Sequence, residues 1–327
     1  MTSIKGKRIA RTVLASAIVV ALAGCAAAYK LDDVGFGSAA VGQQTTISIA
    51  YLPITHAAPL FKAKEQLEAE NPNIKVELVK YGGWAELMDA LNTGRVDGAS
   101  VLVEMAMQAK TQGIPLKLAL LGHHDGNVVV ASNDIMQPSQ LAGKTIAIPN
   151  KQSSHNILVQ QLLESAGLSA SDVTLVEMAP AEMPAGLQSG QIDGYCVAEP
   201  FGAKVVETGV GHVLATSDEL WPNSICCGIV LNADAVSGKS DAVSAFEQAY
   251  ECAGDSLTAE EAVEIAQTDL GQDEQTSRQS MQWISFNDLE VTREAYDKLC
   301  DEVRAFGLSD NPPSYEDFVI SAGGQEG

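Results

Sequence analysis

Histidine, hydroxyl and carboxylate side chains recur in this sequence at the points where predicted strands end. The candidate ligand-binding residues are Thr55, His56, Trp84, Glu104, His123, His124, Asp125, Ser153, Ser154, His155, Glu199 and Trp221. Two groups, Thr55-His56 and Ser153-Ser154, precede predicted helices, where free backbone N–H groups and the helix dipole favour an anionic or carbonyl-like end of a solute. The carboxylates would accept hydrogen bonds from an N–H-bearing or cationic end, and a tryptophan ring would stack on a flat solute. This set predicts a binding site for a small polar molecule.

The sequence contains no arrangement that predicts a catalytic residue. It has no serine–histidine–acid order, no phosphate-binding loop and no acid pair typical of a glycosidase. It also has no Cys-x-x-Cys pair, so neither a zinc knuckle nor a thioredoxin-type redox motif is indicated. We therefore expect no enzyme activity, no cofactor and no metal ligand.

Some of these candidates have purely structural alternatives. Adjacent strand residues point to opposite faces, so at most one of His123 and His124 is expected to enter a cleft. Asp125 would equally suit a hinge turn next to a glycine. Ser153 or Ser154 would equally suit the N-cap of the following helix.

The elements that must position these residues follow a repeated unit. The stretch from Leu187 to Phe201 predicts the end of a helix, a turn at Asp193-Gly194, a short apolar strand and then the acid Glu199. The same order occurs at residues 91–104, where Asp97-Gly98 is followed by an apolar run and another acid. Ligands bind at the carboxyl ends of strands in open α/β sheets. The two copies therefore predict two similar α/β domains with the site between them.

Strands alternate with helices through most of the chain, which predicts an α/β fold with mostly parallel sheets. Apolar runs near residues 125–132 and 216–228 are interpreted as two crossings between the domains. From Asp241 onward the pattern is helical without strand alternation, and this tail is expected to pack on the first domain. The predicted boundaries are residues 45–127 and 226–327 for domain I and residues 128–225 for domain II.

The first 24 residues have the pattern of an export signal. Basic residues precede an apolar run from Val13 to Gly24 that is shorter than the roughly 20 residues needed to span a bilayer. The run ends in Leu-Ala-Gly-Cys25, which resembles the bacterial lipoprotein box. That resemblance implies cleavage before Cys25 and attachment of diacylglycerol to its sulfur. Residues 1–24 are thus predicted to be a signal peptide and residues 25–44 a lipidated tether.

The chain is strongly acidic, with a formal net charge of −22 that becomes −26 when the four basic residues of the signal are removed. A nucleic-acid partner and unspecific adhesion to anionic lipid are therefore not expected. Five cysteines remain besides Cys25, and this odd number is incompatible with a complete disulfide framework in an exported domain. Cys252 and Cys300 would pair if their helices met; otherwise all five are expected to be small buried apolar residues.

Four stretches together resemble a known protein family. They are Tyr51-Leu-Pro-Ile-Thr-His-Ala-Ala-Pro-Leu, Trp84-Ala-Glu-Leu through Asp97-Gly, Leu141-Ala-Gly-Lys-Thr-Ile-Ala-Ile-Pro, and Ile192-Asp-Gly through Glu199-Pro-Phe. With the lipoprotein-like start, their order and spacing resemble the substrate-binding lipoproteins of ABC importers in the nitrate, sulfonate, taurine and bicarbonate group. The resemblance implies a type II periplasmic-binding fold of two domains. It also implies a monomeric solute receptor, lipid-anchored at the outer face of the cell membrane or periplasmic, that delivers its solute to an ABC permease with a cytoplasmic ATPase.

The resemblance further implies which residues line the cleft. They are Thr55-His56, Trp84, the loop after Val103, Ser153-Ser154 and Glu199-Pro200. The sequence departs from the nitrate and bicarbonate members at residues 122–127 and 223–227, and it has no obvious counterpart of their cationic side chain. We therefore predict an organic solute, sulfonate-, taurine- or pyrimidine-like, ahead of nitrate or bicarbonate.

Two alternatives use the same fold. One is an enzyme that resembles thiamine-pyrimidine synthases, with histidines, carboxylates and the Cys226-Cys227 pair arranged as an iron site, although the dense cysteine-rich motif of those enzymes is missing. The other is a metal-binding lipoprotein that uses His56, His123 or His124, His155 and Glu199. No local ligand spacing supports the second alternative.

The lipoprotein prediction can be tested by changing Cys25 to serine. The variant should move from the membrane fraction to the soluble fraction, because acyl chains would supply the whole anchor at about 0.8 kcal/mol per buried CH₂. Fractionation with immunodetection measures the distribution, and Cys300→Ser is the control. A membrane fraction that stays the same in Cys25→Ser would contradict the prediction.

Overall fold

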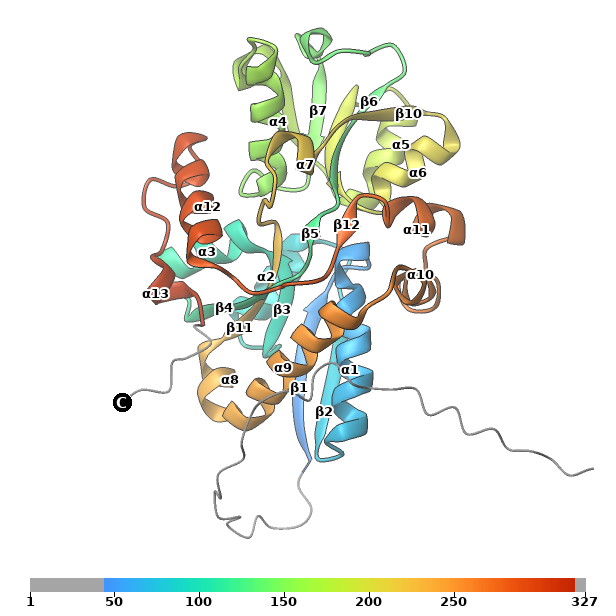
Figure 1. The fold of residues 1–327 in the computed structure, drawn as a ribbon. Helices are drawn as coiled ribbons and strands as arrows, with labels where there is room; N and C mark the ends of the chain where they lie inside the picture. The colour runs from blue at the N-terminus through green and yellow to red at the C-terminus, as the bar shows by residue number, and fades with distance from the viewer. Residues whose placement is uncertain (1–43, 321–327) are drawn as a thin grey trace, which may run out of the picture. The chain divides into compact units, whose positions relative to one another are not determined.

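The computed structural model describes residues 44–320. The predicted signal peptide, Cys25 and nearly all of the predicted tether lie outside these residues. No helix in the described part of the chain is long and apolar enough to cross a membrane. The described residues form two five-stranded sheets with helices around them (Figure 1).

The first sheet has the strand order β2-β1-β3-β11-β4. Its strands are β1 (Thr45–Tyr51), β2 (Ile74–Lys80), β3 (Gly98–Leu102), β4 (Leu116–Leu121) and β11 (Cys227–Asn232). The connections contain η1 (Thr55–Ala57), α1 (Ala58–Glu70), α2 (Trp84–Asn92) and α3 (Val103–Thr111). Apolar residues of β1 such as Ile47 and Ile49 are fully buried under these helices. We call this sheet and its helices the first lobe.

The second sheet has the strand order β10-β6-β9-β7-β8. Its strands are β6 (Asn127–Ser132), β7 (Thr145–Ile148), β8 (Thr174–Glu177), β9 (Gly194–Ala198) and β10 (Gly211–Thr216). Its helices are η2 (Pro138–Leu141), α4 (Ser154–Ser165), η3 (Ala170–Asp172), η4 (Pro180–Glu182), α5 (Met183–Gln188) and α6 (Phe201–Thr208). We call this sheet and its helices the second lobe. The chain enters it through β5 (His124–Asp125) and leaves it through α7 (Ser217–Leu220).

The α/β fold with mostly parallel sheets matches the sequence prediction, and each sheet also contains one antiparallel strand. β1 runs parallel to β2 and β3, and β7 runs parallel to β8 and β9. β11 runs antiparallel to β3 and β4, and β6 runs antiparallel to β9 and β10. The physical reason is that β6 and β11 follow the two passages between the sheets. Each enters its sheet from the opposite end, whereas helical crossovers return the other strands in the same direction.

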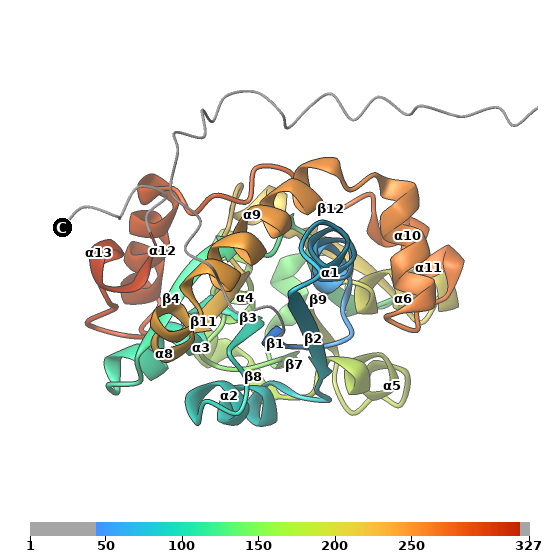
Figure 2. The ribbon, with the colours of Figure 1, turned by 90° about the horizontal axis from the view of Figure 1, so that it is seen from below.

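The tail after β11 is mainly helical. It comprises α8 (Ala233–Gly238), α9 (Ser240–Ser256), α10 (Ala259–Thr268), α11 (Glu274–Ser280), β12 (Ile284–Ser285), α12 (Arg293–Ala305) and α13 (Tyr315–Phe318). α9 packs beside α1 of the first lobe (Figure 2), whereas α11 packs against α6 of the second lobe. β12 pairs antiparallel with β5 at the passage between the lobes. A strand therefore does return in the tail, contrary to the sequence prediction, and the tail touches both lobes.

The repeated Asp-Gly unit has the same structural role in both lobes. Asp97 accepts hydrogen bonds from the backbone N–H and the hydroxyl of Ser48 in β1, at 2.8 and 2.9 Å. Asp193 accepts one from the backbone N–H of Thr145 in β7, at 2.9 Å. Each carboxylate also forms an ion pair with a lysine. The aspartate thus ties the turn before one strand to the neighbouring strand of the same sheet.

The glycine of each unit allows the neighbouring antiparallel strand, β11 or β6, to lie close to its backbone. A Cβ atom at Gly98 would lie 2.6 Å from a methyl group of Leu231 and 3.0 Å from the carbonyl oxygen of Val230, both in β11. A Cβ atom at Gly194 would lie 2.7 Å from the carbonyl oxygen of Val130 in β6. Side chains larger than hydrogen at these positions would therefore push the crossing strands away.

The carboxyl group of Glu199 joins the second lobe to the tail just after β9. It accepts hydrogen bonds from the backbone N–H of Ala203 in α6, at 3.1 Å, and from the hydroxyl of Ser280 in α11, at 2.8 Å. The side chain is fully buried, and burial raises the pKa of Glu199 to about 7 in spite of these two hydrogen bonds. Glu199 therefore keeps its proton to a higher pH in the folded protein than an exposed glutamate does.

The Asp97 interactions predict a stability loss in Asp97→Ala. The variant should lose about 2–3 kcal/mol of unfolding free energy, because the carboxylate is only 17% exposed and accepts charge-assisted hydrogen bonds from Ser48 and Lys239. Asp301→Ala is the matched control, since its ion pair with Arg304 involves a carboxylate that is 80% exposed and should contribute less than about 0.5 kcal/mol. Urea denaturation measures both, and equal losses would contradict this role.

The environment of Glu199 predicts a pH effect on stability. Its pKa in the folded state, about 7, is above the ordinary value of 4.5. The stabilisation is therefore complete below pH 4.5 and is lost as the pH rises through 7. Between pH 5 and 8, Glu199→Gln should gain about 2–3 kcal/mol of unfolding free energy relative to the wild type, since one pKa unit equals about 1.4 kcal/mol.

Urea denaturation at several pH values measures this difference. Glu247→Gln is the matched control, because burial also raises the pKa of Glu247 to about 7 although this residue lies in α9. Each variant should remove only its own share of the pH dependence. A difference between Glu199→Gln and the wild type that stays constant with pH would show that the carboxyl group is already ionised at pH 5.

Candidate functional site

Four buried side chains with nitrogen or sulfur ligand atoms meet where the chain passes between the sheets. His56, His123, Cys226 and Cys227 present ligand atoms that all lie within 4.8 Å of one another. His56 lies in η1 after β1, and His123 lies between β4 and β5. Cys226 directly precedes β11, and Cys227 is its first residue. We call these four residues the histidine–cysteine cluster.

A backbone carbonyl orients the His56 ring. Nε2 of His56 lies 3.1 Å from the carbonyl oxygen of Gly126. Since a carbonyl oxygen only accepts, Nε2 donates the hydrogen bond and Nδ1 carries the lone pair. Nδ1 is buried and has no hydrogen-bond partner among the described residues. The ring of His123 stacks on it, with centroids 3.4 Å apart and an interplanar angle of 32°.

Burial keeps the neighbouring histidines neutral. Burial and then the adjacent His56 ring lower the pKa of His123 to about 4. Burial also lowers the pKa of His155, which lies within electrostatic reach of Cys226 and His123. At neutral pH these imidazoles therefore have a free nitrogen lone pair, the form in which histidine binds metals or accepts hydrogen bonds.

The two cysteines form a contact pair inside the cluster. Their Sγ atoms are 3.8 Å apart, and Sγ of Cys226 lies 3.6 Å from Oδ1 of Asn127. Burial opposes ionisation of Cys226, but the Cys227 thiol and the surrounding histidine rings outweigh it and hold the pKa of Cys226 well below its usual value. Burial and then Cys226 raise the pKa of Cys227 well above its usual value. Ionisation of the pair is thus favoured at Cys226 over Cys227.

Further buried polar groups lie near the cluster without a hydrogen-bond partner in the described part of the chain. They are both ring nitrogens of His155 and Nδ2 of Asn127. The buried carboxyl group of Glu104 and the buried hydroxyl of Ser154 also lie here and interact with each other. Glu104 begins α3 in the first lobe, whereas Ser154 and His155 begin α4 in the second lobe. Burial and then the charge of Cys226 raise the pKa of Glu104 well above its usual value. Polar groups from both lobes therefore converge here.

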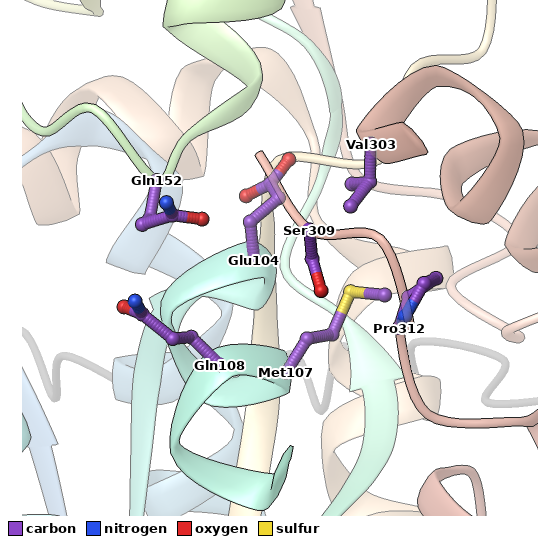
Figure 3. A pocket seen from close by; sticks show the side chains of 7 residues that line it. All are labelled: Glu104, Met107, Gln108, Gln152, Val303, Ser309 and Pro312. Carbon is purple, nitrogen blue, oxygen red and sulfur yellow. The ribbon is translucent and has the colours of Figure 1, made fainter. Parts of the chain in front are cut away.

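Glu104 also borders a small cavity (Figure 3). The lining residues are Glu104, Met107, Gln108, Gln152, Val303, Ser309 and Pro312. Figure 3 shows the Glu104 side chain between the loop that carries Gln152 and the segment that carries Val303. The cavity has a volume of about 10 Å³, which is close to the room that one water molecule needs. Glu104 is therefore near both a water-sized cavity and the Cys226 sulfur.

A larger groove of about 500 Å³ lies between the second lobe and the tail. Its lining includes Pro53, Phe201, Lys204 and Asp273. None of the cluster residues lines this groove. The groove and the cluster are therefore separate features of the structure.

Two candidates next to His123 point elsewhere. Nε2 of His124 lies 2.8 Å from the carbonyl oxygen of Asp288, on the tail. Oδ1 of Asp125 lies 3.5 Å from the hydroxyl of Ser217, at the start of α7. The structure thus brings His123 into the cluster and places His124 outside it, as expected for adjacent residues of an extended chain.

The remaining candidates have other partners. The hydroxyl of Thr55 donates to Oε1 of Gln272 at 3.1 Å, and Ser153 is the N-cap of α4. Glu199 joins the second lobe to the tail. The indole N–H groups of Trp84 and Trp221 are buried without a partner among the described residues. The Trp221 ring lies 5.9 Å from the ammonium group of Lys298. Of the twelve candidates, His56 and His123 belong to the cluster, and Glu104, Ser154 and His155 border it.

The sequence prediction named Cys226 and Cys227 only in the iron-site alternative, and it did not include Asn127. Their signal was the two adjacent cysteines at the predicted return crossing. Neutral imidazoles and thiolates are the ligands of tetrahedral zinc-type sites, and they can also hydrogen-bond a small polar molecule. The cluster therefore has the chemistry for either a metal ion or a polar solute.

Comparison with solved structures gives close matches over most of the chain. The ligand-binding component of an ABC-type import system from Staphylococcus aureus, with zinc bound, is 38% identical, with a TM-score of 0.82 over 85% of this chain and 97% of that chain. The alkanesulfonate-binding protein SsuA from Xanthomonas axonopodis pv. citri, bound to MOPS, is 19% identical, with a TM-score of 0.73 over 86% of this chain and 100% of that chain. At this low identity the second match shows a common fold only.

Comparison with sequences gives more distant relatives and a family. The nitrate import ATP-binding protein NrtC from Synechocystis sp. is 27% identical over 203 residues, which are 55% of this chain but only 30% of that protein. The chain thus spans less than a third of the length of that relative. A model of the NMT1-like family matches residues 41–268. From this match and from the fold that it shares with periplasmic binding proteins, the chain belongs to the NMT1-like family.

Proposed function

We propose that this chain is the extracytoplasmic solute receptor of an ABC importer, and that it holds its solute at the histidine–cysteine cluster. The observation that carries the proposal is the convergence of partnerless, buried polar groups from both lobes on one point. A buried polar atom without a hydrogen-bond partner costs about 1–3 kcal/mol. Several such atoms in one place are best explained by a ligand that satisfies them.

Relatives support the receptor role. The S. aureus protein is a ligand-binding component of an ABC-type import system and aligns over nearly its whole length. We therefore propose an ABC permease with a cytoplasmic ATPase as partners, export with a lipid on Cys25, and a monomer. A receptor is favoured over the thiamine-pyrimidine-synthase-like enzyme, because the 38% identical S. aureus relative is a ligand-binding component of an import system.

The domain division follows the strand order. Strands before β5 and after α7 form the first sheet, and strands between them form the second sheet. We propose domain I at residues 45–127 and 226–327 and domain II at residues 128–225. The cluster residues His123 and Cys226 then flank the two passages between the domains, so a bound solute would be coupled to the relative position of the lobes.

The position of the carboxylates bears on the kind of solute. An organic solute with an N–H-bearing end would need several acceptors together, but only Glu104 borders the cluster. Asp125 lies beside Ser217 and Glu199 beside Ser280. Zinc is bound in the S. aureus relative, so a metal ion joins sulfonate-, taurine- and pyrimidine-like molecules among the candidate solutes.

The receptor proposal predicts a difference between two adjacent histidine variants. The purified chain is stripped of solute by unfolding and refolding, and melting temperatures are measured with a panel of metal ions, nitrate, bicarbonate, sulfonates, taurine and aminopyrimidines. A solute at 100 times its dissociation constant should stabilise the wild type by about 2.7 kcal/mol through mass action. His123→Ala should lose this shift.

His124→Ala is the matched control, because its ring faces Asp288 instead of the cluster. This variant should keep the shift. A solute that stabilises His123→Ala as strongly as the wild type would place the binding site elsewhere. If no solute in the panel shifts the wild type, the receptor proposal fails for all the classes named.

A further inference from the structure

We infer that the solute of this site is a divalent metal ion of the zinc class, bound by Nδ1 of His56, one ring nitrogen of His123 and the sulfur atoms of Cys226 and Cys227. The inference rests on the proposed function, since it names the solute class of that receptor. It also places the site on residues that are widely separated in the sequence.

The cysteine pair has the spacing of a tetrahedral metal site. A zinc–sulfur bond of about 2.3 Å implies sulfur atoms about 3.8 Å apart at tetrahedral angles. The Sγ atoms of Cys226 and Cys227 are 3.8 Å apart. All four ligand atoms lie within 4.8 Å of one another. Neighbouring ligand atoms of a tetrahedral zinc site are roughly 3.3–3.8 Å apart, so the widest pair would have to approach by about 1 Å.

The His56 ring has the orientation of a metal ligand. Metal-binding histidines usually donate their second ring N–H to a carbonyl or carboxylate, which fixes the tautomer and aims the other nitrogen at the ion. Nε2 of His56 donates to the Gly126 carbonyl at 3.1 Å, and Nδ1 is left buried without a partner. Gly126 lies at the first passage between the lobes. The carbonyl group that orients the His56 ring therefore belongs to that passage.

Charge balance favours a divalent cation over an oxyanion. Two thiolates and a divalent ion sum to zero, which removes most of the cost of burying charge. On binding, each S–H bond is replaced by a sulfur–metal bond and its proton passes to the solvent. Among the hydrogen bonds and ion pairs of the described residues, no lysine or arginine contacts the four side chains, so nitrate or a sulfonate would lack a cationic partner there. Sulfur and imidazole ligands also disfavour Mg²⁺ and Ca²⁺, which prefer oxygen.

Titration with Co²⁺ tests the inference, because cobalt occupies zinc sites and reports its ligands by absorption. The chain is reduced, dialysed against chelator and then titrated. One Co²⁺ per chain should bind, with a near-ultraviolet thiolate-to-cobalt band and visible bands of a tetrahedral site, and Zn²⁺ should displace it. Cys226→Ser and Cys227→Ser should each weaken binding by more than about 100-fold, since changes in the outer shell alone cost about 10–100-fold.

Cys300→Ser is the matched control, because this buried thiol lies on α12 near the carbonyl oxygen of Pro313. It should bind Co²⁺ like the wild type. Melting temperatures without metal identify any variant that fails to fold, and His123→Ala then supplies an independent ligand change. The inference would be overturned if cobalt bound without a thiolate band. It would also be overturned if cobalt bound with equal affinity to Cys226→Ser, Cys227→Ser and Cys300→Ser.

Solution scattering separates this inference from the proposed function. A metal solute should change the scattering profile as the lobes close around it. If Co²⁺ binds with the thiolate band but leaves the profile unchanged, the metal site stands as a structural site and the receptor proposal for it fails. In another outcome Co²⁺ does not bind, and an organic solute raises the melting temperature of the wild type but not that of His123→Ala. The receptor proposal then stands and the metal inference fails.

Discussion

The double passage of the chain between two sheets is the constraint on which the site depends. β6 and β11 each lie between two antiparallel neighbours, next to an edge strand of their sheet, and Gly98 and Gly194 make room for this close approach. His123 precedes the first passage and the cysteine pair ends the second. The same connectivity that builds the sheets therefore brings the cluster residues together, and a change in the angle between the lobes would act on their spacing.

The two copies of the Asp-Gly unit show how one local pattern supports two different outcomes. Asp97 and Asp193 make equivalent hydrogen bonds to a neighbouring strand. The acids that follow the two strands diverge, because Glu104 borders the cluster whereas Glu199 binds Ser280 and the start of α6. One acid thus belongs to the environment of the proposed solute, and the other holds the tail against the second lobe.

The polar groups at the passage have a large cost if they remain unsatisfied. Burial penalises every partnerless nitrogen and oxygen there, and the described apolar core around them leaves little room for water. In a receptor this cost favours solute binding, because a solute that satisfies these groups stabilises the arrangement of the lobes that encloses it. The selectivity then depends on ligand type: two imidazoles and two sulfur atoms match a soft or borderline cation better than an oxyanion.

The sequence alone determined the elements, the α/β class and the family resemblance, because helix periodicity, capping residues and Asp-Gly turns are properties of short segments. The short apolar strand predicted between the Asp193-Gly194 turn and Glu199 is β9 in the structure. Only the tertiary structure decided which polar residues meet. It placed His123 inside the cluster and His124 outside it, and it placed the Glu199 carboxyl group between the second lobe and the tail. It also brought Cys226 and Cys227 to the two histidines. These outcomes depend on strand order and direction across residues far apart in the chain, and the periodicity of a short segment carries no information about either.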